Sequence, residues 1–174
     1  MELISKVDID NLEKEMGRYF RNPLILDAGP LVFLLIGLYD PSKKNANDIW
    51  QGHTKGELDL LLNIIKNFKS IIITPQILAE CTNLLNQKID KNKYEFLLGQ
   101  IVEPLKTFGE LYVEENIILG YSEFTTFGST DIGIIECSKQ LNSLIITEDP
   151  KLKNYCYNNQ IPCINFNELR SSTW

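Results

Sequence analysis

Histidine and paired cysteines, the usual ligands of structural zinc, are scarce in this sequence. It has one histidine, His53, and four cysteines, none of which form a C-x-x-C pair. Zinc sites need clustered cysteine and histidine ligands, so a structural zinc is not expected. We expect the cysteines to be small buried side chains in a reducing compartment; they are Cys81, Cys137, Cys156 and Cys163. His53 falls outside every motif described below, and we expect it on the surface.

A long apolar segment is also missing. The longest apolar run, Leu31 to Leu38, is too short to span a bilayer. The segment from Met1 to Phe20 carries several acidic residues, whereas a secretory signal is basic and then apolar. Together these features predict an intracellular, cytoplasmic protein with no membrane partner.

An excess of basic residues is the third absence. Lysine and arginine number 17 against 23 acidic residues, and the net charge is −6. Generic nucleic-acid binders are usually basic, so the total counts against a nucleic-acid partner. It does not exclude one, because a local basic patch can coexist with an acidic total, and a carboxylate-built cation site itself adds negative charge.

Short apolar strands alternate with helical stripes along the chain. The predicted strands are Leu24–Asp27, Ile71–Thr74, Leu111–Val113, Leu144–Thr147 and Ile161–Asn165. The predicted helices are Asp10–Phe20, Pro30–Leu38, Glu57–Phe68, a helix opened by Pro75, Lys93–Phe108 with a kink at Pro104, and Ser129–Leu141. This alternation predicts an α/β fold, a three-layer α/β/α sandwich around a central, mostly parallel five-stranded sheet. We expect one domain over 1–174, with an N-terminal helical extension (1–22) and a helical insertion (40–69).

Four acidic residues are predicted to meet at one edge of this sheet. Asp27 ends the first strand and Asp149 follows the fourth, so both lie at the carboxyl edge. Glu80 is in the second turn of the helix that leaves the second strand, and Asp131 opens the helix that leads into the fourth. Ligands of open α/β sheets bind at this edge.

Carboxylates held together repel, and a divalent cation relieves the repulsion. Mg²⁺ takes oxygen ligands and needs only one or two carboxylates directly, and such a site is competent for phosphodiester hydrolysis. Glu80 is expected to be partly desolvated, since it borders the apolar arc of its helix. Taken singly, Asp27, Asp131 and Asp149 are explained equally well as a strand-end residue, a helix-start acid and a cap. Their joint placement favours a site.

Four motifs in this order resemble the PIN-domain nuclease family, and in particular its VapC-like toxin ribonucleases. They are Leu24-Ile25-Leu26-Asp27-Ala28-Gly29-Pro30-Leu31, Thr74-Pro75-Gln76-Ile77-Leu78-Ala79-Glu80, Thr130-Asp131-Ile132-Gly133-Ile134-Ile135 and Leu144-Ile145-Ile146-Thr147-Glu148-Asp149. The resemblance covers about Leu24 to Phe166.

The resemblance implies an endoribonuclease that uses Mg²⁺ or Mn²⁺ and hydrolyses RNA phosphodiester bonds. Asp27, Glu80, Asp131 and Asp149 would hold the cation and its activated water, supported by the hydroxyl of Thr147. It also implies a homodimer and, for toxins, an antitoxin that blocks the acidic site. Lys151 and Lys153, which directly follow Asp149, are best placed to meet RNA phosphates.

The sequence departs from the family pattern at Ala28 and Gly29, where many members have a small hydroxyl residue. One alternative is a PIN-like protein-interaction module with weak or no activity. Another is a different α/β enzyme. The haloacid-dehalogenase pattern wants a second aspartate two residues after the first, where Gly29 stands, and no phosphate-binding glycine motif is present.

Overall fold

The computed structural model describes residues 14–39, 53–88 and 91–172. Its sheet has five strands in the order β3-β2-β1-β4-β5, and every neighbouring pair is parallel. The strands are β1 (Leu24–Leu26), β2 (Ile71–Ile73), β3 (Gly109–Glu110), β4 (Leu144–Thr147) and β5 (Cys163–Asn165). Central strands β1 and β4 are buried along their whole length, as continuous apolar runs in a parallel sheet must be. The predicted fold class is confirmed.

The third strand lies two residues earlier than the sequence predicts. Its residues pair with Ile72 and Ile73, and Leu111 adds one more hydrogen bond to the carbonyl of Ile73. Strand β2 ends there, because Pro75 opens the next helix, so nothing remains for Tyr112 and Val113 to pair with. The prediction of a strand over Leu111–Val113 is therefore wrong. Its apolar character reflects burial of Val113 outside the sheet.

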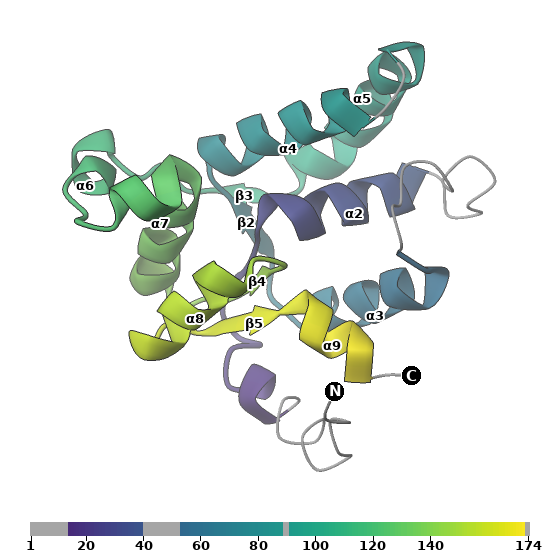
Figure 1. Cartoon of the computed structure of the whole chain (residues 1–174). Coiled ribbons are helices and arrows are strands. Elements are labelled where there is room, and N and C mark those ends of the chain that lie inside the picture. The colour runs from purple at the N-terminus through teal and green to yellow at the C-terminus, as the bar shows by residue number, and fades with distance from the viewer. Residues whose placement is uncertain (1–13, 40–52, 89–90, 173–174) are drawn as a thin grey trace.

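Helices cover both faces of the sheet (Figure 1). The first group is α2 (Ala28–Tyr39), α4 (Pro75–Lys88) and α5 (Lys91–Lys106), which pack against one another. The second includes α7 (Phe124–Leu141) and α8 (Pro150–Asn158), which contact each other and β4. The remaining helices are α3 (Lys55–Ile65), which packs on α2, α6 (Glu115–Leu119), which packs on α7, and α9 (Phe166–Ser172), which follows β5.

The predicted helices match these elements to within a few residues at most ends. Helix α5 continues through Pro104 to Lys106. Helix α3 starts with a capping box, in which the Thr54 side chain accepts from the backbone N–H of Glu57 and the Glu57 side chain accepts from that of Thr54. The first residues of the predicted helix Asp10–Phe20 lie outside the described residues. None of the described helices is long and apolar enough to cross a membrane.

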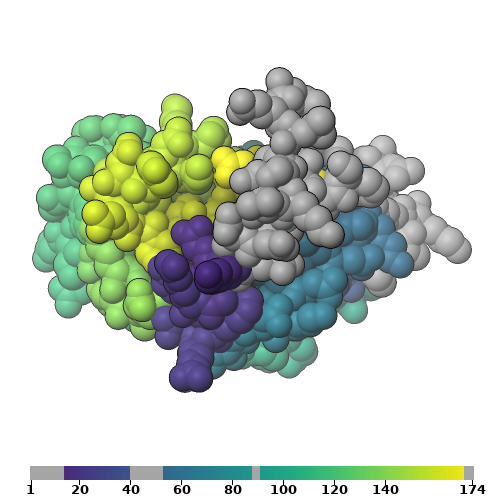
Figure 2. All heavy atoms as spheres, turned by 90° about the horizontal axis from the view of Figure 1, so that it is seen from below, coloured from purple at the N-terminus to yellow at the C-terminus, as the bar shows by residue number. Residues whose placement is uncertain are grey.

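Residues 14–22, purple in Figure 2, lie on the face of the domain seen in that view. Residues 14–17 are helical, and Met16 is buried. Phe20 makes an edge-to-face contact with Phe68, with ring centroids 5.1 Å apart. The side-chain amide of Asn22 donates to the carbonyl of Asn142 at the end of α7. These contacts tie the start of the described chain to two later segments.

Candidate metal centre

Asp27 lies where β1 ends and α2 begins. Its backbone N–H donates to the carbonyl of Ile146 in β4, so the residue continues the pairing of the two central strands. One carboxylate oxygen accepts from the backbone N–H of Ala28, at 2.6 Å. The other accepts from the hydroxyl of Thr147, also at 2.6 Å. Two donors therefore orient a half-buried carboxylate at the carboxyl edge of the sheet.

Asp149 follows β4 and caps α8. Its carboxylate accepts from the backbone N–H of Lys151, with Pro150 at the first helical position. Its own N–H donates to the hydroxyl oxygen of Thr147, at 2.9 Å. Thr147, which is completely buried, thus accepts from Asp149 and donates to Asp27. The supporting role that the family resemblance implies for Thr147 is consistent with this geometry.

Asp131 stands in the first turn after a break in α7. Gly128 has φ 73° and ψ −173°, so the helix is interrupted there and restarts with Ser129. The left-handed region is open to glycine because it has no Cβ. The prediction of a new helix from Ser129 is thus correct, although helical turns also precede the break. In this position Asp131 is close enough to Asp27, Asp149 and Glu80 for their charges to affect it.

Glu80 lies in the second turn of α4 and is exposed, contrary to the predicted partial desolvation. The helix buries Ile77, Cys81 and Leu85 completely, and this stripe carries its contact with the core. Glu80 lies beside that stripe with its side chain in solvent, so its carboxylate is free to turn toward a ligand.

The four carboxylates interact electrostatically. Burial, and to a smaller extent the negative charges of Asp27, Asp149 and Glu80, together raise the pKa of Asp131 to about 7. Burial also raises the pKa of Asp27, opposed by its hydrogen bonds from Thr147 and Ala28, with smaller contributions from Glu80 and Asp149. Four acids from segments that are far apart in the sequence therefore lie close enough together to affect one another's ionisation.

The four acids are not, however, gathered into a closed metal cage. Within the described parts of the chain, no three histidine, cysteine, aspartate or glutamate side chains stand in position to hold one ion. Charge repulsion acts over longer distances than coordination, so the two observations agree. An all-oxygen set fits Mg²⁺ or Mn²⁺, and Mg²⁺ keeps several waters and binds through only one or two carboxylates. Asp27 and Asp149, which follow the adjacent strands β1 and β4, would be the carboxylates for such a cation.

No protein-family model matches the chain, and no curated protein matches its sequence.

The two lysines predicted to meet RNA differ in their surroundings. Lys151 is exposed at the start of α8, and its backbone N–H is the donor that Asp149 accepts from. The ammonium of Lys153 lies 3.4 Å from a carboxylate oxygen of Glu168. Lys151 is therefore the more accessible cation beside the acidic group.

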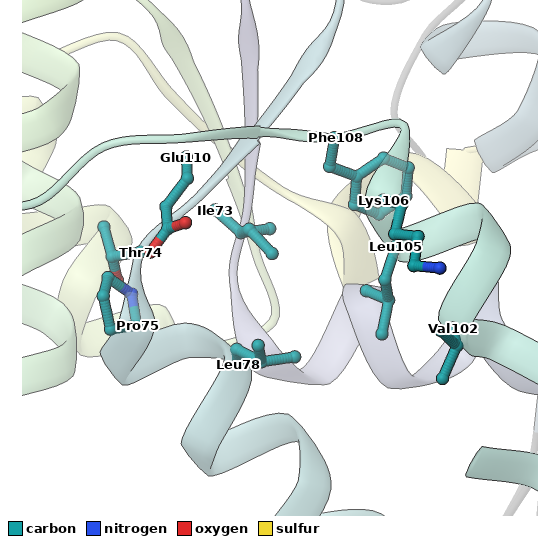
Figure 3. A pocket seen from close by; sticks show the side chains of 9 residues that line it. All are labelled: Ile73, Thr74, Pro75, Leu78, Val102, Leu105, Lys106, Phe108 and Glu110. Carbon is teal, nitrogen blue, oxygen red and sulfur yellow. The ribbon is translucent and has the colours of Figure 1, made fainter. Parts of the chain in front are cut away.

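A mostly apolar hollow of about 380 Å³ lies between α4, α5 and the edge of the sheet (Figure 3). Ile73, Leu78, Leu105 and Phe108 line it, and the carboxylate of Glu110 points toward Thr74 at one end. Glu110 is on β3, two strands from β1, which corresponds to about 10 Å. The hollow is thus a neighbour of the four-acid group and not part of it.

The cysteines behave as predicted, whereas His53 does not. Cys81, Cys137 and Cys156 are buried, Cys163 is half-buried, and all four are free thiols. Burial raises the pKa of Cys81 to about 12, so this thiol is unreactive. His53 was expected on the surface but is half-buried against Phe33, with ring centroids 4.2 Å apart and planes 24° from parallel. The sequence offered no local signal for this, because the contact depends on how α2 and α3 pack.

Proposed function

We propose that this protein is a divalent-cation-dependent endoribonuclease of the PIN type, which hydrolyses RNA phosphodiester bonds at the carboxyl edge of its sheet. The residues assigned to the cation are Asp27, Glu80, Asp131 and Asp149, and Thr147 positions two of them. The support for this proposal is chemical and geometric: an all-carboxylate group in the place where open α/β sheets bind ligands.

One observation carries the proposal. The pKa of Asp131 is raised to about 7 by burial and, in addition, by the negative charges of three other acids, Asp27, Asp149 and Glu80. A protein gains nothing in stability from holding like charges together, whereas a bound cation makes the arrangement favourable. Perturbed titration of this kind in a group of functional residues is typical of active sites.

Each residue of the proposed site would have its own role in binding the cation or the RNA. When bound, Mg²⁺ or Mn²⁺ lowers the pKa of a coordinated water and screens negative charge on the phosphate. Thr147 and the N–H of Ala28 keep the Asp27 carboxylate oriented and favour its ionised form. Asp149 is held by the N-terminus of α8. The exposed Glu80 and the partly buried Asp131 complete the negative rim. Lys151 supplies a positive charge for an RNA phosphate near this rim.

The deciding experiment pairs cation binding with RNA cleavage. Wild-type protein should bind Mn²⁺ saturably in a calorimetric titration and cleave single-stranded RNA only when Mg²⁺ or Mn²⁺ is present. Asp27→Asn, which keeps the size of the side chain, should lose at least about a hundredfold in cleavage rate, a loss comparable to removal of one stabilising group in other active sites. Glu103→Gln, an exposed change on α5, serves as the matched acid-to-amide control. Equal cleavage by wild type and Asp27→Asn would refute the proposal.

A second candidate is a PIN-like interaction module with little or no activity. It is favoured by the absence, within the described residues, of three ligands already placed around one ion, and by the acidic net charge of −6. The same titration separates the two candidates, since a module without a site shows no saturable Mn²⁺ binding.

The family resemblance extends the proposal to a cellular role. A VapC-like toxin would act in the cytoplasm, pair with an antitoxin that blocks the acidic edge, and form a homodimer. A small reading frame with a basic tail beside the gene, encoding a protein that co-purifies with this chain and stops its RNA cleavage, would support that role. The absence of such a neighbouring gene would refute the toxin role and would leave the nuclease proposal unaffected.

A further inference from the structure

The loop that carries Asp149 has a second acidic residue, Glu148, that no part of the proposed cation site uses. Thr147 donates to Asp27, whereas the Glu148 side chain lies over Gly29 in the first turn of α2. A Cβ added to Gly29 would lie 3.0 Å from a carboxylate oxygen of Glu148. The glycine that departs from the family pattern is therefore the residue that leaves room for Glu148.

The Glu148 carboxylate meets the only histidine in the sequence. Its Oε1 atom lies 3.4 Å from Nε2 of His53. The other ring nitrogen, Nδ1, lies 2.9 Å from a guanidinium nitrogen of Arg170 in α9. His53 precedes the N-cap of α3, so this line of side chains joins the helical insertion, the C-terminal helix and the loop after β4.

The identity of these partners settles which ring nitrogen of His53 carries the hydrogen. A guanidinium group can only donate, so Nδ1 must accept from Arg170 and must be unprotonated. The hydrogen is then on Nε2, where it faces the Glu148 carboxylate. Glu57 lies 3.7 Å from Nδ1 and 3.9 Å from the Arg170 guanidinium, and it balances the charge of the arginine. Arg170 thus selects the imidazole form whose N–H is on the side of Oε1 of Glu148, a buried oxygen 3.4 Å from Nε2.

Two further contacts restrain this arrangement, one on the face of the His53 imidazole and one on the backbone of the loop that carries Glu148. Phe33 in α2 stacks on the imidazole, which restricts its rotation. The side-chain amide of Asn167 donates to the backbone carbonyl of Glu148 at 3.0 Å. The loop between β4 and α8 is therefore anchored by three elements that contribute no acid to the candidate site.

We propose that Arg170, His53 and Glu148 form a positioning triad that holds the Glu148–Asp149 loop against α2 and so fixes Asp149 beside Asp27. None of the three contacts the cation. As far as it concerns cation binding and cleavage, the inference rests on the proposed nuclease function. The triad also gives the helical insertion and α9 a role, because they supply the histidine and the arginine.

The first test measures the tautomer of His53 and does not depend on any activity of the protein. Since the chain has one histidine, long-range nitrogen–proton NMR of the full-length protein reports on His53 alone. We expect neutral His53 in the Nε2–H form, and a mixture of both forms in Arg170→Gln. The opposite tautomer in the wild type would overturn the triad, as would an unchanged tautomer in Arg170→Gln.

The second test measures coupling with His53→Phe, Glu148→Ala and the double variant. Phenylalanine keeps the stacking on Phe33 but removes both ring nitrogens. Each single variant should weaken Mn²⁺ affinity and lower kcat about tenfold, with KM changed little, as is usual for residues that orient metal ligands. The double variant should also lose about tenfold and not a hundredfold, because either change breaks the same link. Losses that multiply would overturn the triad.

Glu148→Gln separates positioning from charge. The amide oxygen of glutamine can stand opposite Nε2–H as the carboxylate oxygen does, so this variant should stay within about twofold of wild type, whereas Glu148→Ala should not. A glutamine variant as impaired as the alanine variant would overturn the triad, even where His53→Phe fails to fold. If wild-type protein neither binds Mn²⁺ nor cleaves RNA, the nuclease proposal fails alone. The triad is then judged by the NMR result and by faster amide exchange of residues 147–152 in Glu148→Ala.

Discussion

The hydroxyl of Thr147 donates to Oδ2 of Asp27 over 2.6 Å, although 120 positions separate the two residues in the sequence. The same hydroxyl oxygen accepts from the backbone N–H of Asp149 at 2.9 Å. One buried side chain therefore links the ends of two adjacent strands and the two acids that follow them. Both the stability of the domain and the ionisation of Asp27 depend on this link.

Replacing Thr147 by valine should destabilise the domain and weaken cation binding. Valine fills the same volume but leaves Asp27 and the N–H of Asp149 without their partner, at a cost of about 1–3 kcal/mol. The pKa of Asp27 should rise further, because the bond from Thr147 lowers it. Urea unfolding measures the first effect and Mn²⁺ calorimetry the second. Thr147→Ser keeps the hydroxyl and is the control. A valine variant as stable as the serine variant would contradict the argument.

Asp131→Asn should change how stability depends on pH. Burial and neighbouring negative charge raise the pKa of Asp131 from 3.8 to about 7 in the folded protein. A raised pKa stabilises the fold fully below the unfolded value, and this contribution is lost as pH rises through the folded value. The melting temperature of the asparagine variant, relative to wild type, should therefore rise between about pH 4 and about pH 7 and level off above that.

The measurement needs a chelator, since a bound cation would favour the ionised carboxylate and mask the effect. Adding Mn²⁺ at the higher pH should then stabilise the wild type and not the variant. A melting-temperature difference that stays constant across this range would show that Asp131 ionises normally.

Two glycine-to-alanine changes in helices should have opposite effects. Gly37 in α2 is buried, and an added Cβ would overlap both methyl carbons of Leu58, itself buried in α3. Gly37→Ala should cost about 1–3 kcal/mol through this overlap. Gly99 in α5 is exposed, with nothing within 4 Å of an added Cβ. Gly99→Ala should gain about 0.5–1 kcal/mol from helix propensity alone. Chemical unfolding measures both, and a neutral or stabilising Gly37→Ala would show that α2 and α3 separate easily.

Lys151→Ala should weaken RNA binding more than Lys153→Ala does. Lys151 is exposed beside Asp149, whereas Lys153 is paired with Glu168. Removing one phosphate contact should weaken binding at all sequences and reduce the slope of affinity against salt concentration by about 1. Binding is measured without divalent cations, so that no cleavage occurs. If RNA affinity depends on salt concentration with the same slope in Lys151→Ala and in the wild type, Lys151 does not contact an RNA phosphate.

Most of the candidate site could be predicted because it depends on two properties that the sequence shows directly: which residues follow apolar strands, and the common direction of those strands. Asp27 and Asp149 follow apolar strands, and parallel strands that share helical crossovers bring such residues to one edge. Other features could not be predicted in this way. The weak third strand was misplaced at Leu111–Val113, because its position depends on where its neighbour β2 stops pairing. Glu80 was expected to be partly buried, but the face of α4 that packs was decided by α2 and the core.

What the sequence by itself determined about this protein is the order of its strands and helices and the edge at which its acids meet. These follow from apolar runs, from proline and glycine positions and from the direction of the chain, all of which are short-range properties. Only the tertiary structure decided that His53 would lie between Arg170 and Glu148. His53 and Arg170 are 117 residues apart in the sequence. Such contacts form when separate helices pack together, and no local pattern of residues records which surfaces will meet.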